Sequence, residues 1–302
     1  MESTIRTPDT SSVIVGVDGS EPARLAALWA AGEAVRRSRP LRLVYGADTD
    51  ARALYLSAES VEKVRAAGRV LLDDTAKAVA AAYPGLLVTT EFSRADAVTS
   101  LYRAGGLHGT IVVGSRGLGG FDSLMLGSVG LDTAAGARTP VIVVRGVDGT
   151  GERGSVLVAV RDEHDLACAR YAAREAELGK ASLRLVHVWN ILRSVGSVVP
   201  MLDDVDAIAG EHAAVLEAVT DAVHAEFPEL PVESDAEKGV SVAGVLVEAS
   251  RRADLLVMGG RRALTPLGIG RSLGRVPHRV LHHAHCPVLL LPRVGADFGS
   301  GS

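Results

Sequence analysis

Apolar residues along this chain fall into short continuous runs that alternate with longer segments of helical periodicity. In the first half the runs are SVIVGVD, LRLVYG, TIVVGSRG and TPVIVVR, with no regular alternation of polar and apolar positions. Continuous runs of this kind are typical of parallel strands buried on both faces, joined by crossover helices. One such helix is expected between Ser60 and Pro84, where an apolar face recurs at about one helical turn through Val64, Leu71, Leu72, Thr75 and Val79. The pattern predicts a five-stranded doubly wound α/β domain, which binds ligands at the carboxyl ends of its strands.

The second half of the chain repeats the first. SVLVAVR repeats SVIVGVD, LRLVHV repeats LRLVYG, and CPVLLLPR repeats TPVIVVR. TIVVGSRG returns as LLVMGGRR, so that Gly114 corresponds to Gly259. We therefore expect two copies of roughly 140 residues each. The segment GVDGTGERG between them has the composition of a flexible linker. The predicted domains are residues 11–146 and 154–293.

Composition narrows the class of protein. The 302 residues suffice for two domains, and 47% hydrophobic and 23% charged residues suit packed globular units. A net charge of -4 provides no general attraction to nucleic acids or anionic membranes. The polar start MESTIRTPDTSS lacks the blocks of a signal peptide, and the two cysteines, Cys168 and Cys286, form no disulfide framework. We expect a cytoplasmic protein without a nucleic-acid or membrane partner.

A glycine-rich segment follows the fourth apolar run. In VVGSRGLGGFDSLMLGSVG the pattern G-x2-G-x9-G-S falls on Gly114, Gly117, Gly127 and Ser128. Glycines allow positive φ and close backbone approach to a ligand, and helix N-terminal amides with a serine hydroxyl can donate to an anion. The pattern favours a phosphate site, although such glycines can also serve only a turn and a surface loop. The P-loop and dinucleotide-binding patterns are both missing.

On this signature the chain resembles the universal stress protein family in its tandem form, over roughly residues 13–145 and 155–293. The resemblance implies two adenine nucleotide alpha hydrolase-like domains. It also implies ATP binding, often with Mg²⁺ or Mn²⁺, and at most slow hydrolysis. The expected function is that of a nucleotide-dependent stress-response regulator or sensor.

The resemblance also implies where the nucleotide lies in the first half. Asp18 would be near the ribose, although it can equally be a turn residue or helix cap. Gly46 stands where the family usually has an apolar residue whose backbone meets adenine. Arg116 could neutralise phosphate charge or be solvated, and Ser115 and Val129 would act through backbone amides. The full expected set is Gly16, Asp18, Gly46, Gly114, Ser115, Arg116, Gly117, Gly127, Ser128 and Val129, with no catalytic residue and no metal ligand.

The second copy departs from the signature. Arg161 stands at the position of Asp18, Arg262 replaces Gly117, and Gly274-Arg275 replaces Gly127-Ser128 after a loop two residues longer. Asp162 could partly substitute for Asp18. Since arginine adopts positive φ less readily than glycine, we expect the second half not to bind ATP. Binding of a different anion by its arginines remains open.

The remaining expectations concern metals and partners. HHAHCP resembles a metal cluster but falls at a helix end, where cationic groups suit the helix dipole, so no metal site is assigned. The apolar runs PVIVV and PVLLL predict that the two halves pair as a pseudo-dimer. A homodimer and an unknown regulatory protein partner are further expectations. A slow ATP-hydrolysing enzyme and a nucleotide-independent dimeric scaffold are the alternative functions.

Overall fold

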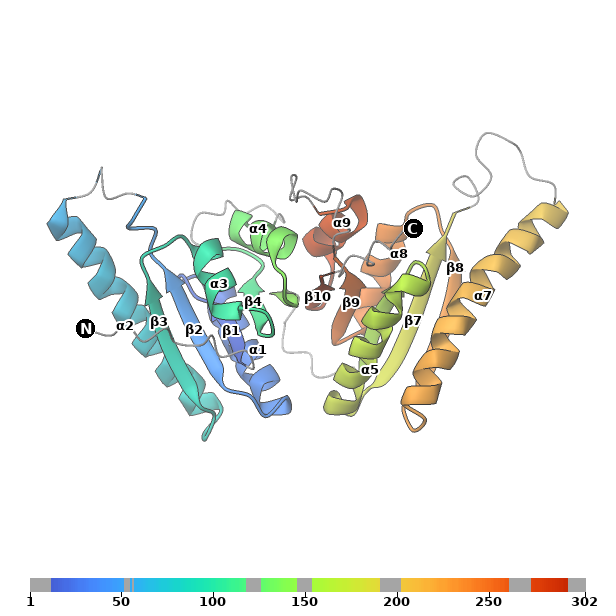
Figure 1. The fold of residues 1–302 in the computed structure, drawn as a ribbon, viewed down its shortest axis with the longest axis horizontal. Coiled ribbons are helices and arrows are strands. Elements are labelled where there is room, and N and C mark those ends of the chain that lie inside the picture. Colours follow the sequence, from blue (N-terminus) through green and yellow to red (C-terminus); the bar gives the residue numbers. More distant parts are fainter. Residues whose placement is uncertain are drawn as a thin grey trace, which may run out of the picture. The chain divides into compact units, whose positions relative to one another are not determined.

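A computed structural model of the chain describes residues 12–51, 55, 57–117, 126–145, 154–190, 202–260 and 273–292. These residues form two compact units, one within residues 12–145 and one within residues 154–260 and 274–292. In each unit helices cover both faces of a parallel sheet (Figure 1). The predicted linker, most of the glycine-rich loop and Arg262 lie outside the described residues.

The first unit has the strand order β3-β2-β1-β4-β5, with every described pair parallel. Its strands are β1 (Val13–Gly16), β2 (Leu41–Gly46), β3 (Val88–Ser93), β4 (Thr110–Gly114) and β5 (Val141–Val144). One face is covered by α1 (Glu21–Arg36) and α2 (Ala58–Ala82), the other by α3 (Ala97–Gly105) and α4 (Ser128–Gly136). The doubly wound α/β fold predicted from the apolar runs is confirmed.

The second unit repeats this arrangement with the strand order β10-β9-β6-β7-β8. Its strands are β6 (Ser155–Val160), β7 (Ser182–Trp189), β8 (Val232–Lys238), β9 (Leu255–Gly259) and β10 (Val288–Leu291). One face carries α5 (Leu166–Gly179) and α7 (Leu202–Glu226), the other α8 (Val242–Ala249) and α9 (Arg275–His283). Two short 3₁₀ turns are η1 (Glu163–Asp165) and η2 (Ser250–Arg252).

The cores are built from the apolar runs. In β1, Val13, Ile14 and Val15 are fully buried, because helices cover both faces of this central strand. Alanines on the inner face of α1 let the helix lie close to the sheet. Cys168, on α5, is buried, as a small core residue would be. In the described parts of the chain, no helix combines the length and apolar character needed to cross a membrane.

Local sequence explains where the helices begin and end. The N-cap side chains of α1, α2, α3 and α8 accept a hydrogen bond from a first-turn amide, and these residues are Ser20, Ser57, Asp96 and Ser241. The helix predicted before Pro84 is α2, which ends at Ala82. Three described helices differ: the N-cap of α5, Asp165, makes no side-chain cap hydrogen bond, and the N-caps of α4 and α9 are Gly127 and Gly274, which have no side chain to cap with. The first-turn amides of α4 and α9 are therefore left without a side-chain acceptor at the N-cap.

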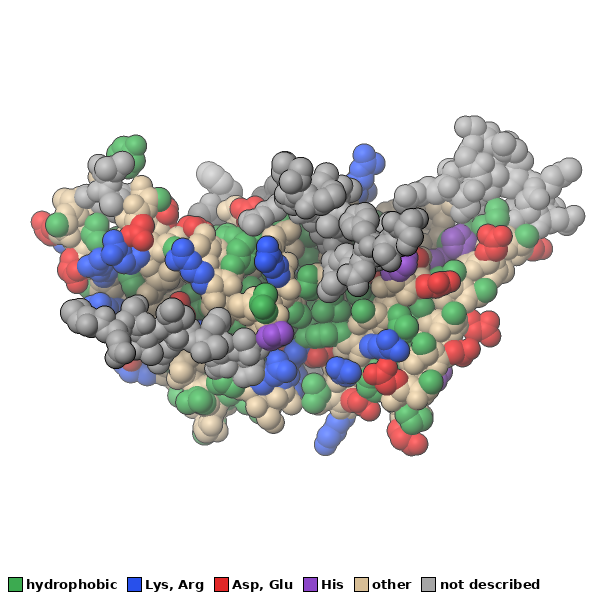
Figure 2. Space-filling view, in the orientation of Figure 1, with side chains coloured by type: hydrophobic (Ala, Val, Ile, Leu, Met, Phe, Trp, Pro, Cys, Tyr) green, Lys and Arg blue, Asp and Glu red, His purple; other side chains and the backbone are tan. Residues whose placement is uncertain are grey.

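The two long helices present different surfaces. On α2, basic and acidic side chains alternate and pair, as in Lys63–Glu59 at 2.6 Å and Lys77–Asp73 at 2.5 Å. The sequence of α7 contains seven acidic residues and no lysine or arginine. Figure 2 shows acidic side chains along this helix. The surface of α7 thus gives the second unit no attraction for an anionic ligand.

Alanine substitutions at two glycines test the packing, because one is expected to lower the stability of its unit and the other to raise it. An alanine Cβ at Gly46 would lie 2.6 Å from the Cα of Ala97, whereas Gly210 on α7 has nothing within 4 Å. We expect Gly46→Ala to destabilise the first unit by about 1–3 kcal/mol through overpacking. Gly210→Ala should stabilise the second unit by about 0.5–1 kcal/mol through helix propensity. Denaturant unfolding followed by circular dichroism measures both, and equal effects of the two substitutions would contradict this packing.

Candidate functional site

The predicted site residues gather at one edge of the first unit. Strand order reverses between β1 and β4, and this switch point is where doubly wound folds bind ligands. Gly16 is the last residue of β1 and Asp18 follows it, while Gly46 ends β2 and Gly114 ends β4. Ser115, Arg116 and Gly117 follow β4, and Gly127, Ser128 and Val129 form the start of α4. The fold therefore brings residues from four separate segments to the carboxyl ends of neighbouring strands.

Gly114 lets the end of β4 lie against the first turn of α1. A Cβ at this position would be 2.7 Å from the carbonyl oxygen of Pro22 and 3.0 Å from the amide nitrogen of Ala23. Beside this contact, Ser20 Oγ accepts from the Ala23 amide at 3.3 Å and donates to the Arg116 carbonyl at 3.5 Å. Any side chain at Gly114 would push the strand and helix apart, since it would meet backbone atoms.

The Asp18 carboxylate lies between the β1 turn and the segment after β4. Its Oδ1 accepts from the Ser20 amide at 2.9 Å, as the structural alternative for this residue predicts. A Cβ on Gly117 would approach the other oxygen, Oδ2, within 2.4 Å. The glycine is thus needed for close approach, and the carboxylate is fixed beside the glycine-rich segment.

The start of α4 offers hydrogen-bond donors. Gly127 is extended, with φ -68° and ψ 156°; its amide donates to the Ser115 carbonyl at 3.0 Å, and its own carbonyl accepts from Leu131 at 3.1 Å. The three amides between them, at Ser128, Val129 and Gly130, precede any intrahelical acceptor. Ser128 is exposed and Val129 is 40% exposed. These amides and the positive end of the helix dipole suit an anion.

Two details differ from the expectations. Positive φ among the described glycines occurs at Gly19, Gly85, Gly106 and Gly154, so the expectation of positive φ in the signature is wrong for Gly114, Gly117 and Gly127. These glycines serve close approach instead. The Ser115 amide, expected to contact the ligand, donates to the Val144 carbonyl at 3.1 Å because β4 and β5 remain paired there.

One residue at this edge escaped the sequence analysis. Arg145 follows β5 and is half-buried, and burial together with the nearby charge of Arg116 lowers the pKa of its guanidinium. Arg116 itself is exposed. The two like charges close together favour an anionic neighbour. The available signal was a basic residue directly after the apolar run PVIVV, which lies outside the glycine pattern.

Gly16 and Gly46 have packing roles as well. A Cβ at Gly16 would be 3.3 Å from the Leu101 side chain, which can move, whereas one at Gly46 would meet the backbone of α3. The departure from the family at Gly46 therefore has a structural cause in this chain, namely the close packing of β2 against the start of α3.

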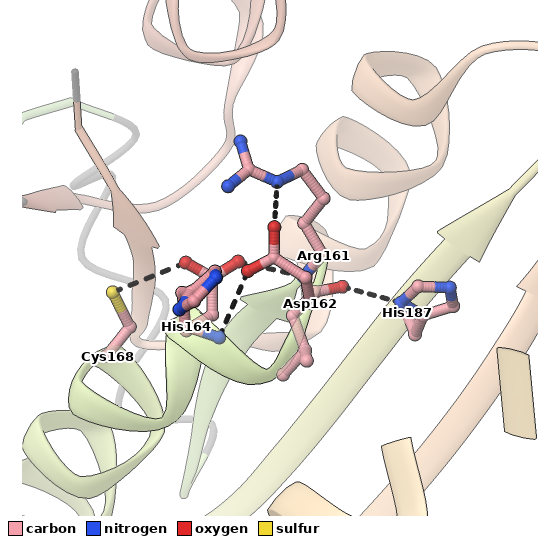
Figure 3. Close-up of polar contacts among 7 residues, drawn as sticks. Arg161, Asp162, His164, Cys168 and His187 are labelled. Carbon is pink, nitrogen blue, oxygen red and sulfur yellow. Dashed lines mark hydrogen bonds and ion pairs between the residues drawn. The ribbon is translucent and has the colours of Figure 1, made fainter. Parts of the chain in front are cut away.

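The second unit fills the corresponding edge with its own side chains. Arg161 Nε donates to Asp162 Oδ2 at 2.8 Å, and Asp162 Oδ1 accepts from the His164 amide at 3.1 Å (Figure 3). The Arg161 amide donates to Asp165 Oδ2 at 2.9 Å. Asp162, proposed above as a partial substitute for Asp18, thus neutralises Arg161 and caps the 3₁₀ turn. No signature-like arrangement of glycine against carboxylate occurs among the described residues of this edge.

Burial controls the ionisable groups beside this turn. Burial raises the pKa of Asp165, and burial with the adjacent Asp165 raises the pKa of the Cys168 thiol to about 12. Cys168 is therefore a thiol at neutral pH and a poor nucleophile. The described part of the chain contains no group of three or more His, Cys, Asp or Glu side chains that could hold a metal ion.

Comparison with known proteins identifies the family. The model of the universal stress protein family matches residues 10–145 and again residues 152–292. The chain belongs to the universal stress protein family. Its tandem organisation is shared with a universal stress protein of Mycobacterium tuberculosis, which is 31% identical over 95% of this chain and 98% of the relative.

Further relatives agree over nearly the whole length. A universal stress protein of Mycolicibacterium smegmatis is 27% identical, covering 92% of this chain and 96% of the relative. The crystal structure of a universal stress protein from Archaeoglobus fulgidus superimposes with a TM-score of 0.69 at 18% identity, covering 95% of this chain and 98% of that one. The fold of two universal stress protein domains is thus shared over the full tandem.

The contact between Gly117 and Asp18 can be tested by a double-mutant cycle. Gly117→Ala places a methyl group against Asp18 Oδ2, so the carboxylate must turn aside and lose its hydrogen bond from the Ser20 amide, which should destabilise the first unit by about 0.5–1.5 kcal/mol. In an Asp18→Ala background the methyl group occupies the vacated space, so most of this loss should disappear. Urea unfolding should give a coupling energy of at least about 0.5 kcal/mol.

Gly127→Ala is the matched control for this cycle. A Cβ there would lie 3.6 Å from Arg116 Cα, an ordinary van der Waals distance, and should not couple to Asp18. Additive effects of Gly117→Ala and Asp18→Ala would show that the two residues do not touch.

Proposed function

We propose that this universal stress protein binds ATP in its first unit and acts as a nucleotide-dependent stress-response regulator or sensor. The observation that supports the proposal most directly is the uncapped start of α4. Among the described helices, α1, α2, α3 and α8 satisfy a first-turn amide with a Ser or Asp cap, but α4 begins at a glycine close to Gly117, which lies beside Asp18. Donors left for an external acceptor are what a phosphate group requires.

Each group at this edge has a part in the proposal. The first-turn amides of α4 and the Ser128 hydroxyl donate to phosphate oxygens, and the charges of Arg116 and Arg145 offset the phosphate charge. Asp18 would repel phosphate but accepts hydrogen bonds from hydroxyl groups, which places it at the ribose. The backbone at the end of β2, around Gly46, would contact adenine. Mg²⁺ or Mn²⁺ would enter with the nucleotide, bound chiefly by phosphate oxygens.

A sensor needs the bound state to differ from the free state. We propose that ATP shifts the population of conformations at the segment between Gly114 and Ser128 and that another protein binds the resulting surface. The described residues at this edge supply amide donors, positive charges and the Asp18 carboxylate, which can accept a hydrogen bond from a ligand hydroxyl. Such groups favour binding of a nucleotide over catalysis. The two cysteines are buried thiols, which suits the reducing cytoplasm, where we place the protein.

Substitutions in the first unit test the assigned residues. Ser128→Ala should weaken ATP binding by roughly 1.5–3 kcal/mol, because a charged acceptor loses a donor. Gly117→Val should weaken it at least as much, because the side chain meets Asp18. Isothermal titration calorimetry measures the affinities, with Arg275→Ala, at the equivalent position of α9, as the matched control.

Wild-type affinity in both first-unit variants would refute the assignment. Phosphate release in the same samples would favour the slow hydrolase, and no ATP binding at all would favour the scaffold.

The number of bound nucleotides tests the assignment to one unit. We expect one ATP per chain, because Arg161 and Asp162 neutralise each other at the second edge and Arg275 replaces the serine. Equilibrium dialysis with labelled ATP gives the stoichiometry. A value near two, or binding that survives Gly117→Val combined with Ser128→Ala, would show that the second unit binds as well.

The domain limits 11–146 and 154–293 remain part of the proposal, with ATP bound in the first domain and a degenerate motif in the second. The pairing of the two halves and the formation of a homodimer also stay predictions. Light scattering of the intact chain decides the homodimer.

A further inference from the structure

Two histidines are hydrogen-bonded between the sheet and a helix of the second unit. His187, on β7, is 3% exposed, and its Nε2 lies 2.8 Å from Nδ1 of the part-buried His212 on α7. The other ring nitrogen of His187, Nδ1, lies 3.0 Å from the Val160 carbonyl oxygen, the contact drawn in Figure 3. Trp189 also stacks on His212, with ring centroids 5.2 Å apart. The pair thus joins α7 to β7 and to the end of β6.

The positions of the protons in this pair follow from its acceptors. A carbonyl oxygen can only accept, so His187 Nδ1 carries a hydrogen. In the neutral pair His187 Nε2 is then the acceptor, and His212 Nδ1 donates to it. One added proton can be taken by His212 Nε2 with the bond intact. A second must go to His187 Nε2, where two N–H groups would face each other across 2.8 Å. The second proton therefore breaks the contact.

The first unit has no imidazole at the equivalent positions. Tyr45 on β2 is equivalent to His187 on β7, because each directly follows a valine that pairs with the central strand of its unit. Gly68 on α2 is equivalent to His212 on α7, because each is the eleventh residue of its helix. A Cβ at Gly68 would lie 2.8 Å from the rings of Tyr45 and Phe92, so those rings fill the space above the glycine. Ala236 takes the position of Phe92. The second unit has exchanged large rings and a glycine for two imidazoles and an alanine.

Charged groups around the pair come from each neighbouring element. Asp162, after β6, faces His187 and is itself paired with Arg161. The turn η1 contacts α7 and carries Glu163, His164 and Asp165. Lys238 of β8 lies over the Trp189 ring at 6.0 Å, and Glu211 precedes His212 on α7. The charge of Asp162 favours a protonated His187, whereas burial and the neighbouring His212 oppose it.

We propose that the His187–His212 hydrogen bond is an acid-sensitive contact, which holds α7 on β7 at neutral pH and is released when the pair takes up its second proton. Burial is the largest influence and lowers the pKa of His187 from its ordinary value of 6.5. The opened state therefore binds a proton more readily than the closed one. The closed contact is fully stable above about pH 6.5 and loses stability as the pH falls toward the lowered pKa. The second unit would then respond to acidification, independently of ATP binding in the first.

Trp189 reports on the contact directly. The chain has two tryptophans, Trp29 and Trp189, so Trp29→Phe leaves a single reporter beside His212. On titration from neutral to acidic pH we expect two steps in its emission. In the first step, uptake of the first proton by the histidine pair quenches the Trp189 emission. In the second step, opening of the contact exposes the Trp189 ring and shifts its emission to the red, with a midpoint below pH 6.5. Between pH 6.5 and that midpoint, hydrogen exchange corrected for its intrinsic pH dependence should show α7 opening increasing by up to about tenfold per pH unit, and the increase should level off at lower pH.

The variants separate this pair from other histidines. In the Trp29→Phe background, His212→Gln should remove both steps. The double substitution His187→Tyr with His212→Gly installs the first unit's own residues and should also remove them. His224→Gln, an exposed histidine in the last turn of α7, is the matched control and should leave both steps unchanged. Persistence of the red shift in either of the first two variants would overturn the proposal.

Wild-type protein provides a measurement that no folding failure can affect. Long-range ¹H–¹⁵N correlation spectra distinguish the histidine tautomers, and we expect one buried ring with hydrogen on Nδ1 only at neutral pH. That ring should gain its second proton below pH 6.5, together with the change in Trp189. If that buried ring instead carried hydrogen on Nε2 only, or gained its second proton at or above pH 6.5, the inference would be refuted.

Discussion

The candidate site depends on one close approach, that of the end of β4 to the first turn of α1. It is possible because Gly114 has no side chain to meet the Pro22 carbonyl and the Ala23 amide. Once these backbones are in contact, Ser20 can bridge from the α1 cap to the Arg116 carbonyl, and Asp18 lies against Gly117. The glycines of the signature therefore serve the fold first. The edge on which an anion could bind follows from the same contacts.

The two units show how a duplicated fold can diverge at its edge while its core is kept. Both retain parallel strands, buried aliphatic residues and a glycine at the start of the helix that precedes the last strand. At the edge, however, Arg161 and Asp162 form an ion pair where the first unit has Asp18 and a glycine. Charges that neutralise each other within the chain are unavailable to a ligand. Retention of the core explains why the second unit keeps the fold although the residues at its edge differ.

Replacement of Tyr45 and Gly68 by His187 and His212 is a coordinated change. A smaller ring on the strand accompanies a larger side chain on the helix, so that the space between the sheet and the helix stays filled. The exchange also introduces two hydrogen-bonded imidazoles, which the aromatic packing lacks. By contrast, the high pKa of the buried Cys168 thiol makes this residue an inert part of the same unit. In the proposal for the second unit, the response to pH therefore lies in the histidine pair and not in the buried thiol.

The sequence alone determined the repeat, the doubly wound fold, the helix ending near Pro84 and the position of the glycine signature. Each of these depends on residues close together in the chain, where apolar runs, prolines and spacings are directly visible. Only the tertiary structure decided that the signature glycines serve close approach rather than positive φ, that the Ser115 amide is already bonded, and that Arg145 joins Arg116. It also paired His187 with His212. These contacts join residues distant in sequence, and their geometry is set by the packing of whole strands and helices, which no local pattern encodes.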